Sequence, residues 1–374
     1  APPPQPPRAM VLGLGLSAAS TSYLSGFGAF SKMRKESPAT FTAPALSAAA
    51  AKLSMVPSPA EDGKVMGQGP FPASYFLAGA LSGGICCGLT HGALTPVDVV
   101  KTRMQLDPAK YNQGFIGGFK QISEAEGAGA LLTGLMPTAQ GYFIQGWFKF
   151  GGVEFFKINI TKQIGDEAAW NNRNNIYLAS SAMAEFIADI FLCPYEACRI
   201  RLVSNPDYAP GMAACASKLM SEYGFIGAFY SGFIPILFKQ IPYTMAKFAV
   251  QGATAEQIYT SLGTDSSSMS KGGNLGVSLS SGVVAGVVAA IISHPADSLL
   301  SKINKAGAGG TGSMFQRLGN IAAETGIVKL CTQGLFARCI MIGTLTAGQF
   351  GVFDIVMGMV GAKKFHFHDP KAAH

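Results

Sequence analysis

Ionisable side chains stand inside apolar stretches of this sequence, in the segments "GICCGLTHGALTPVD" and "AEFIADIFLCPYE". His91 precedes Asp98 by seven residues, so both lie on one face of a helix. Glu185 precedes Glu196 by eleven residues, which returns to one face, and Asp189 lies between them. A charge in an apolar helix is costly, and series of acids and histidines are typical of proton relays. We expect these five residues to take part in proton coupling; for His91 the alternative is a structural, hydrogen-bonded histidine.

Three lysines lie in other apolar stretches: Lys149, Lys239 and Lys247. A lysine near the middle of a membrane is costly unless it faces water or meets an anion. One interpretation is ion pairing with the acids above. The other is an anion site built from the lysines and neutral hydrogen-bond donors, and both signs in one cavity fit an anion that travels with protons. Such neutral groups precede Lys149 on the same stretch: Thr138, Tyr142 and Gln145.

A proline followed two residues later by an acid occurs three times, at a period of roughly 100 residues. The copies begin at Pro96, Pro194 and Pro295. Other positions recur at matching distances and support three copies of one unit. Thirteen residues before each proline is a small residue, and about 38 residues after it a glycine opens the next apolar run: Gly83, Ser181, Gly282, then Gly134, Gly232, Gly334.

Each unit therefore predicts an apolar helix, a break at the proline, a short amphipathic helix and a second apolar helix. We expect six membrane-spanning helices, each long enough to cross a hydrocarbon core of about 30 Å. They are predicted near residues 73–105, 135–163, 173–205, 233–262, 274–304 and 335–361. The pairs Gly79/Gly83 and Gly282/Gly286 would let helices approach closely.

The composition is that of a polytopic membrane protein, since 48% of the 374 residues are hydrophobic and only 13% are charged. The net charge of +7 fits either positive loops set by membrane topology or an anionic substrate. We divide the chain into an N-terminal arm at 1–70, presequence-like or disordered, repeats at 71–170, 171–270 and 271–362, and a tail at 363–374. The "HFH" of the tail predicts a solvated segment rather than a metal site.

The three motifs "PVDVVK", "PYEACR" and "PADSLL" resemble those of the mitochondrial carrier family. The resemblance covers residues 73 to 361. It implies an all-α membrane protein of the mitochondrial inner membrane, with six transmembrane helices in three tandem repeats related by pseudo-threefold symmetry. Each repeat would have a short amphipathic helix on the matrix side.

In this family, the acid of one motif pairs with the base of the next and closes a gate on the matrix side. The resemblance implies that Asp98 meets Arg199 and that Asp297 meets Lys101, with Gln105 bracing a gate ion pair. The implied matrix gate consists of Pro96, Asp98, Lys101, Thr102, Gln105, Pro194, Glu196, Arg199, Pro295 and Asp297.

The third motif lacks its base, because Leu300 stands where a lysine or arginine is usual. Glu196 would then lack its partner unless Lys302 reaches back. A carboxylate that loses its cation holds a proton more readily, which makes Glu196 a candidate proton carrier. Water or Lys302 is the alternative partner.

Further segments, among them "GYFIQGWFKFGGVE", "KQIPYTMAKFA" and "GLFARCIMIGTLTAGQF", resemble the phosphate-transporting members of this family. The resemblance implies import of inorganic phosphate with a proton, or against hydroxide, by alternating access. It also implies contacts with membrane lipid such as cardiolipin, association with ATP synthase or respiratory complexes, and neither cofactor nor nucleic acid. The implied phosphate path is Thr138, Tyr142, Gln145, Lys149, Lys239 and Lys247; the transport-critical set is His91, Asp98, Thr102, Glu185, Glu196 and Asp297.

The cytosolic ends of the even-numbered helices depart from the family pattern of an aromatic residue, an acid and a base. They read "VEFFK", "VQGAT" and "FDIVM", so that only Glu154, Lys157 and Asp354 remain. We expect few ion pairs at this end, and how it closes is open.

Other functions are compatible with parts of the sequence. The same fold serves carriers of other small anions, and the adjacent pair Cys86–Cys87 would suit copper, although buried free thiols are the simpler interpretation of the seven cysteines. A structural partner of a respiratory assembly is a further alternative. We expect no enzyme, because the sequence has no P-loop, dinucleotide fingerprint or metal-ligand cluster.

Overall fold

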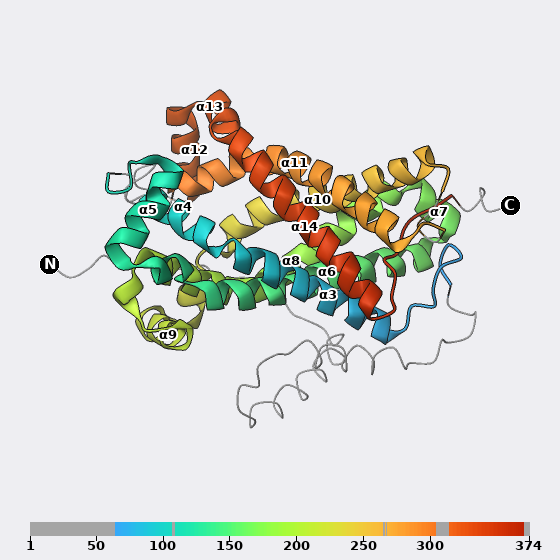
Figure 1. Ribbon diagram of the computed structural model, residues 1–374, viewed down its shortest axis with the longest axis horizontal. Helices are drawn as coiled ribbons and strands as arrows, with labels where there is room; N and C mark the ends of the chain where they lie inside the picture. Colours follow the sequence, from blue (N-terminus) through green and yellow to red (C-terminus); the bar gives the residue numbers. More distant parts are fainter. Residues whose placement is uncertain (1–63, 107–108, 265, 267, 304–313, 370–374) are drawn as a thin grey trace, which may run out of the picture. The chain divides into compact units, whose positions relative to one another are not determined.

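The computed structural model describes residues 64–106, 109–264, 266, 268–303 and 314–369. Most of the predicted N-terminal arm, residues 1–63, lies outside this part. Six long stretches of helix run along the structure, where the sequence predicts them (Figure 1). They are α3 (Ala73–Ala93) with α4 (Thr95–Leu106), α6 (Leu135–Ile164), α8 (Arg173–Ser204), α10 (Phe233–Ser261), α11 (Lys271–Ile303) and α14 (Leu335–Met359).

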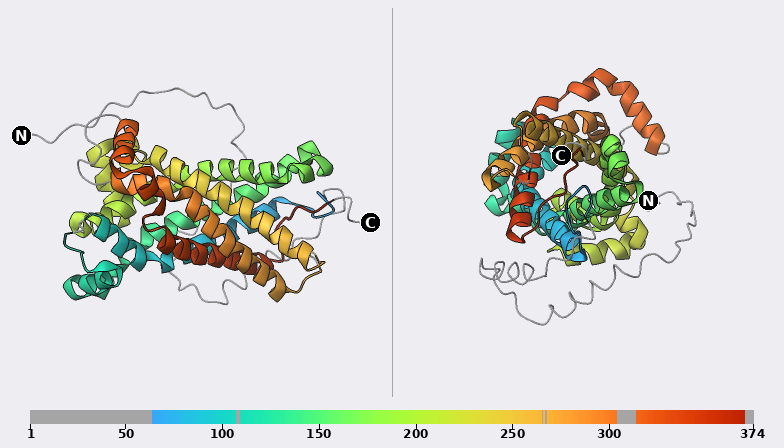
Figure 2. Two further views of the ribbon diagram at one scale, coloured as in Figure 1. Left: turned by 90° about the horizontal axis from the view of Figure 1, so that it is seen from above. Right: turned by 90° about the vertical axis from the view of Figure 1, so that its right-hand side faces the viewer.

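The long helices form a ring, because each packs against the next in the order α3, α6, α8, α10, α11, α14, and α14 packs back on α3 (Figure 2). Shorter helices gather at one end of this ring, which we call the short-helix end: α5 (Gly114–Glu126), α9 (Met212–Phe229), α12 (Met314–Thr325) and α13 (Ile327–Thr332). At the other end, the terminal end, lie α7 (Asp166–Asn171) and both ends of the described chain.

Four helices within the described residues are long and apolar enough to cross a membrane by themselves: Ala73–Ala93, Arg173–Ser204, Lys271–Leu300 and Arg338–Met359. A fifth span qualifies only when α9 and α10 are joined across a bend of 45°. The sequence explains the difference, because α6 and α10 carry lysines within their length, whereas among the other spans only Lys271, the first residue of its span, is a lysine. Those charged helices hold the residues from which a polar path could be built.

Glycines bring neighbouring helices into backbone contact. A Cβ atom on Gly83 of α3 would lie 2.3 Å from the carbonyl oxygen of Gly146 on α6, and one on Gly282 would lie 2.7 Å from the Cα of Ala347. Gly286 is equally close to α14, whereas Gly79 has its nearest neighbour at 4.0 Å. The predicted close approach is therefore confirmed at Gly83, Gly282 and Gly286.

The prolines of the three motifs interrupt their helices less than the sequence predicts. Only the first is interrupted, at Leu94, so that Pro96 falls in the first turn of α4, where no backbone donor is needed. Pro194 and Pro295 lie inside continuous helices. Pro194 leaves the Ile190 carbonyl without its helical donor, and the Tyr230 hydroxyl supplies one at 3.1 Å. This substitute bond offsets the cost of the proline in α8.

Candidate functional site

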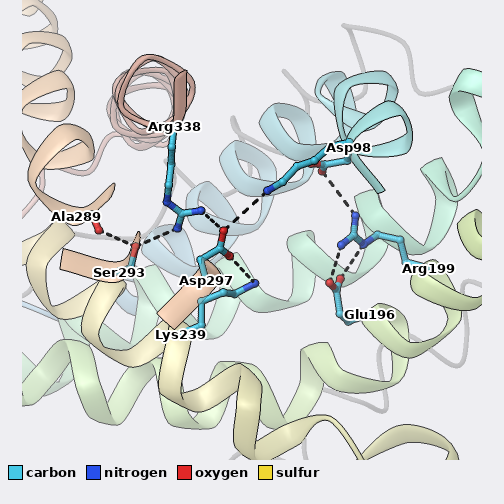
Figure 3. Close-up of polar contacts among 9 residues, drawn as sticks. Asp98, Glu196, Arg199, Lys239, Ala289, Ser293, Asp297 and Arg338 are labelled. Atoms are coloured by element: carbon cyan, nitrogen blue, oxygen red, sulfur yellow. Dashed lines mark hydrogen bonds and ion pairs between the residues drawn. The ribbon is translucent and has the colours of Figure 1, made fainter. Parts of the chain in front are cut away.

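Asp297 lies at the short-helix end between cations from three helices (Figure 3). Its carboxylate is 4.0 Å from the Lys101 ammonium of α4 and 4.0 Å from that of Lys239 on α10. Arg338 of α14 donates to the same carboxylate and, at 3.0 Å, to the Ser293 hydroxyl. The predicted pair Asp297–Lys101 is therefore present. Lys239, which was expected on the substrate path, belongs to this cluster as well.

Arg199 joins two acids (Figure 3). Its guanidinium is 3.7 Å from the Asp98 carboxylate, as predicted, and donates to Glu196 at 2.6 and 2.8 Å. The prediction that Glu196 lacks a cation unless Lys302 reaches back is wrong. Arg199 lies one turn further along α8, and its two-pronged side chain can bind a carboxylate through both oxygens. The absence of a base at Leu300 thus leaves Asp98 and Glu196 sharing one arginine.

The remaining residues of the predicted gate are placed only in part. Thr102 is half-buried on α4. The side chains of Gln105 and Lys302 lie outside the part of the structure that is described. Bracing by Gln105 therefore stays a prediction.

A second polar cluster lies further into the ring. The Gln145 amide of α6 donates to Glu185 at 2.9 Å and to Asp189 at 3.2 Å, and both acids belong to α8. The Lys149 ammonium lies 3.0 Å from Glu185. Both carboxylates are completely buried, so two acids share one ammonium and one amide away from water.

Lys247 of α10 is buried without an acid. Its ammonium donates to the Gln349 side chain of α14 and lies 4.9 Å from the Phe150 ring centre and 5.2 Å from that of Phe350. Among the described residues it forms no ion pair, and only 1% of the residue is exposed. A buried cation of this kind is costly unless an anion joins it.

Gln349 was missed in the sequence, although the repeat contains the signal. A glycine opens each of the helices α6, α10 and α14. Fifteen residues after these glycines stand Lys149, Lys247 and Gln349, and the next residue is a phenylalanine in all three helices. These rings contact one another pairwise at centroid distances of 5.0, 5.5 and 5.7 Å, and belong to Phe150, Phe248 and Phe350. All three rings lie within 5.5 Å of the Lys247 ammonium, so the aromatic layer covers this lysine.

Two further predicted residues contact each other. The His91 ring of α3 stacks on the Tyr142 ring of α6 with centroids 3.6 Å apart. Thr138 donates to the carbonyl of Gly134 at 2.7 Å, which engages its hydroxyl within α6. Glu185 and Glu196 do not form one group, because eleven residues of helix separate them by about 16 Å. The expected proton-coupling set is therefore divided between two depths.

Access to solvent differs between the two ends of the path. The exposed fraction is 37% for the Lys101 side chain and 27% for Asp98, but 5% for Lys149 and 0% for Lys157. The charged side chains at the short-helix end are therefore more exposed than those further into the ring and at the terminal end. There, Lys157 pairs with Glu154 at 2.6 Å, while Asp354 accepts a hydrogen bond from Ser278.

The sulfur atoms of Cys86 and Cys87 lie 3.9 Å apart in the packed interior. Across the described residues, no three or more histidines, cysteines and acids are grouped so that they could hold a metal ion. The structure therefore gives no specific support to copper as a cargo.

Comparison with known proteins relates the chain to one family. The profile described as "Mitochondrial carrier protein" matches residues 72–163, 172–262 and 272–364. "Mitochondrial substrate carrier family protein N" of Dictyostelium discoideum is 46% identical over 296 residues, 78% of this chain and 97% of the relative. "Mitochondrial phosphate carrier protein 3, mitochondrial" of Arabidopsis thaliana is 42% identical over 82% of this chain and 79% of the relative. "Phosphate carrier protein, mitochondrial" of Caenorhabditis elegans is 39% identical over 89% and 92%.

Proposed function

Because the chain belongs to the mitochondrial carrier family, whose members are transporters and not enzymes, we propose that its substrate is inorganic phosphate. It is a multi-pass protein of the mitochondrial inner membrane. The Arabidopsis and Caenorhabditis relatives are named as phosphate carriers. Phosphate is small, anionic and rich in acceptor oxygens, which are the properties that a site of lysines and amide donors recognises.

The buried ammonium of Lys247 is the observation that carries this proposal. Lys149 and Gln349 stand at the equivalent positions of the other two repeats, so one ion on the ring axis meets all three helices. Lys149 is held by Glu185, but within the described part of the chain Lys247 has only Gln349 and the aromatic rings around it. A phosphate that reaches Lys247 supplies the negative charge that the surrounding side chains do not.

Protons enter through the two buried acids. Glu185 and Asp189 together carry one negative charge more than Lys149 neutralises, and a single added proton removes the excess. An oxygen of Asp189 has no hydrogen-bond partner among the described residues and is the natural position for that proton. Phosphate and a proton then enter the ring together. Exchange of phosphate for hydroxide gives the same net result.

The short-helix end corresponds to the matrix end in this proposal. The clusters around Asp297 and Arg199 close that end when substrate is admitted from the other side. The loose contacts of 4.0 Å to Lys101 and Lys239 are the ones that separate first. Phosphate drives this alternation only if it binds the two open states with different free energies.

Uptake of labelled phosphate into proteoliposomes tests the proposal. We expect saturable uptake by the full chain and a loss of more than about tenfold in Lys247→Ala, since a hydrogen bond to a charged group contributes about 1.5–3 kcal/mol. Lys120→Ala is the matched control, because Lys120 is exposed and pairs only with Glu124 at the surface. Unlabelled dicarboxylate and nucleotide, each offered in excess, should compete weakly.

Two results would count against phosphate. A folded preparation that takes up no phosphate, but takes up another of the offered anions, assigns the ring to that anion. Equal uptake by Lys247→Ala and Lys120→Ala would show that the Lys247 ammonium is not part of the substrate path.

A further inference from the structure

The chain beyond the last long helix turns back into the ring. Helix α14 ends at Met359, and Gly361 adopts a left-handed conformation with φ of 74°. The amide of Gly361 donates to the carbonyl of Gly358, and that of Ala362 donates to Met357. This paired arrangement is a Schellman cap, which reverses the direction of the chain after a helix. Residues 362–367 consequently run inside the ring at the terminal end (Figure 2).

The backbone of Phe365 is bound by helices α3 and α6. Its amide lies 3.0 Å from the Tyr75 hydroxyl and 3.1 Å from the Glu154 carboxylate, and its carbonyl accepts from Lys157 at 3.2 Å. Tyr75 also donates to Glu154 at 2.8 Å. The ion pair on α6 is thus completed by the peptide group of the tail.

Side chains of the tail contact the other walls. The Phe367 ring lies 5.2 Å from that of Tyr177 on α8, measured between centroids. The Lys364 ammonium donates to Gln251 of α10 at 2.5 Å and lies 4.7 Å from the ring centre of Phe350 on α14. None of the Phe365 residue and 6% of Phe367 is exposed. The expectation of a solvated "HFH" segment is wrong for this reason.

Gln68, which precedes the first long helix, forms hydrogen bonds with the tail. The Gln68 side-chain amide donates to the carbonyl of His366 at 2.5 Å, and its oxygen accepts from the amide of His366 at 3.3 Å. The Gln68 side chain therefore binds both backbone groups of His366, as the backbone of a neighbouring β-strand would. A third contact joins Gln68 to the ring of His368 at 2.9 Å.

We propose that residues 362–367 are a plug that closes the terminal end of the ring and must leave it before substrate can enter from that side. The proposal rests on the proposed function, because it concerns the same path. It answers how an end with few ion pairs is held shut: the Phe365 peptide group joins α3 to α6, and the Lys364 side chain donates to Gln251 of α10. Removal of the plug would uncover the aromatic layer above Lys247.

Reversible cross-linking tests the plug. Cysteines replace Phe367 and Tyr177 in the full chain, and a short bis-methanethiosulfonate links them in proteoliposomes. We expect a high yield of the linked peptide pair, a loss of phosphate uptake of more than about tenfold, and recovery after reduction. Phe367→Cys alone and the unmutated chain, treated alike, control for the loss of an aromatic contact and for the native cysteines.

The two proposals fail in different ways. If the unmutated chain takes up no phosphate, phosphate is the wrong substrate, while the yield of the cross-link still reports whether the tail occupies the ring. A negligible yield overturns the plug whatever the substrate is. Complete cross-linking with unchanged uptake overturns the requirement that the tail leaves.

Discussion

Arg199 shows how a single side chain can redistribute the charges of a whole end of the molecule. The sequence indicates a missing base at Leu300 and an acid, Glu196, without a partner. In the structure Arg199 binds Glu196 through two hydrogen bonds and still reaches Asp98. Glu196 therefore has a cation, and its place in a gate stays a prediction. Asp98 and Glu196 share this arginine, but the described short-helix end has four cations for three acids, whereas Glu185 and Asp189 have one lysine between them.

Replacement of Asp189 by asparagine should separate phosphate binding from proton coupling. The substitution removes one negative charge while the amide oxygen can still accept from Gln145. We expect phosphate–phosphate exchange to persist and the stimulation by an inward proton gradient to fall at least about fivefold, the lower end of usual coupling between linked sites.

Glu196→Gln is the matched control for this substitution, because it neutralises an acid of the same helix that already has Arg199. Gradient stimulation that survives in Asp189→Asn but disappears in Glu196→Gln would show that Glu196, and not Asp189, is the residue that carries the proton.

The residues of the site were predictable where one contact follows from the repeat, as in Asp98–Arg199 and Asp297–Lys101. They were not predictable where a side chain chooses among several partners within reach. The spacing alone cannot say that Arg199 turns to its own helix, or that Arg338 and Lys239 both reach Asp297. Gln349 was not recognised because its repeat has an amide at the position where the second repeat has Lys247.

At the scale of the helices, glycine and proline determine how the ring is assembled. The repeat of small residues located the six long helices, because these residues mark where backbones touch and where helices begin. It did not reveal that α8 continues through Pro194, since the compensating hydroxyl of Tyr230 comes from a distant part of the sequence.

Tyr230→Phe should destabilise the protein by about 1 kcal/mol, the usual net contribution of one hydrogen bond. The substitution leaves the carbonyl of Ile190 unpaired beside Pro194. Thermal unfolding in detergent measures the effect against Tyr223→Phe. Tyr223 is half exposed, and its hydroxyl accepts a long contact of 3.4 Å from Arg201. Equal melting temperatures for the two variants would show that Pro194 needs no substitute donor.

Gly146→Ala should be more damaging, because the new Cβ atom would lie 2.1 Å from the carbonyl oxygen of Gly83. We expect a loss of about 1–3 kcal/mol from the forced separation of α3 and α6. Gly129→Ala is the control, since nothing lies within 4 Å of its added atom. Similar stability of both alanine variants would contradict the tight contact between these helices.

At the scale of the whole ring, the two ends close by different means. The short-helix end is held by ion pairs that the sequence motifs announce. The terminal end has the pairs Lys157–Glu154 and Arg173–Glu256, and it is also held by an aromatic layer and by the tail, which no motif of charged residues indicates. The tail escaped prediction because "KKFHFH" resembles a polar terminus, and its contacts with α3, α6, α8 and α10 join residues far apart in the sequence.

Docking of the tail should depend on pH through Lys364. Burial lowers the pKa of Lys364 from 10.5 to about 8, with Lys157 and Lys247 acting in the same direction and Asp354 and Glu154 opposing them. Docking therefore favours the neutral amine, so it is weakest below pH 8 and strengthens as the pH rises from about 8 to 10.5. Burial lowers the pKa of His366 well below its usual range as well, so protonation of His366 in acid also weakens docking.

A spin label on a cysteine at the exposed position of Lys363 would follow this equilibrium. We expect the label to be more mobile at pH 7 than at pH 9.5, and the difference to vanish when Lys364 is also replaced by methionine. A mobility that rises with pH would contradict the assignment of Lys364 to the docked state.

The central claim is that phosphate and protons share one path through the ring, and one measurement tests it most directly. Labelled phosphate uptake is compared in proteoliposomes with and without an inward proton gradient, for the full chain and for Lys149→Ala. Uptake that the gradient stimulates, and that the substitution abolishes, is the predicted result. Uptake by the unmutated chain that is indifferent to the gradient, or uptake that survives intact in Lys149→Ala, would contradict the account.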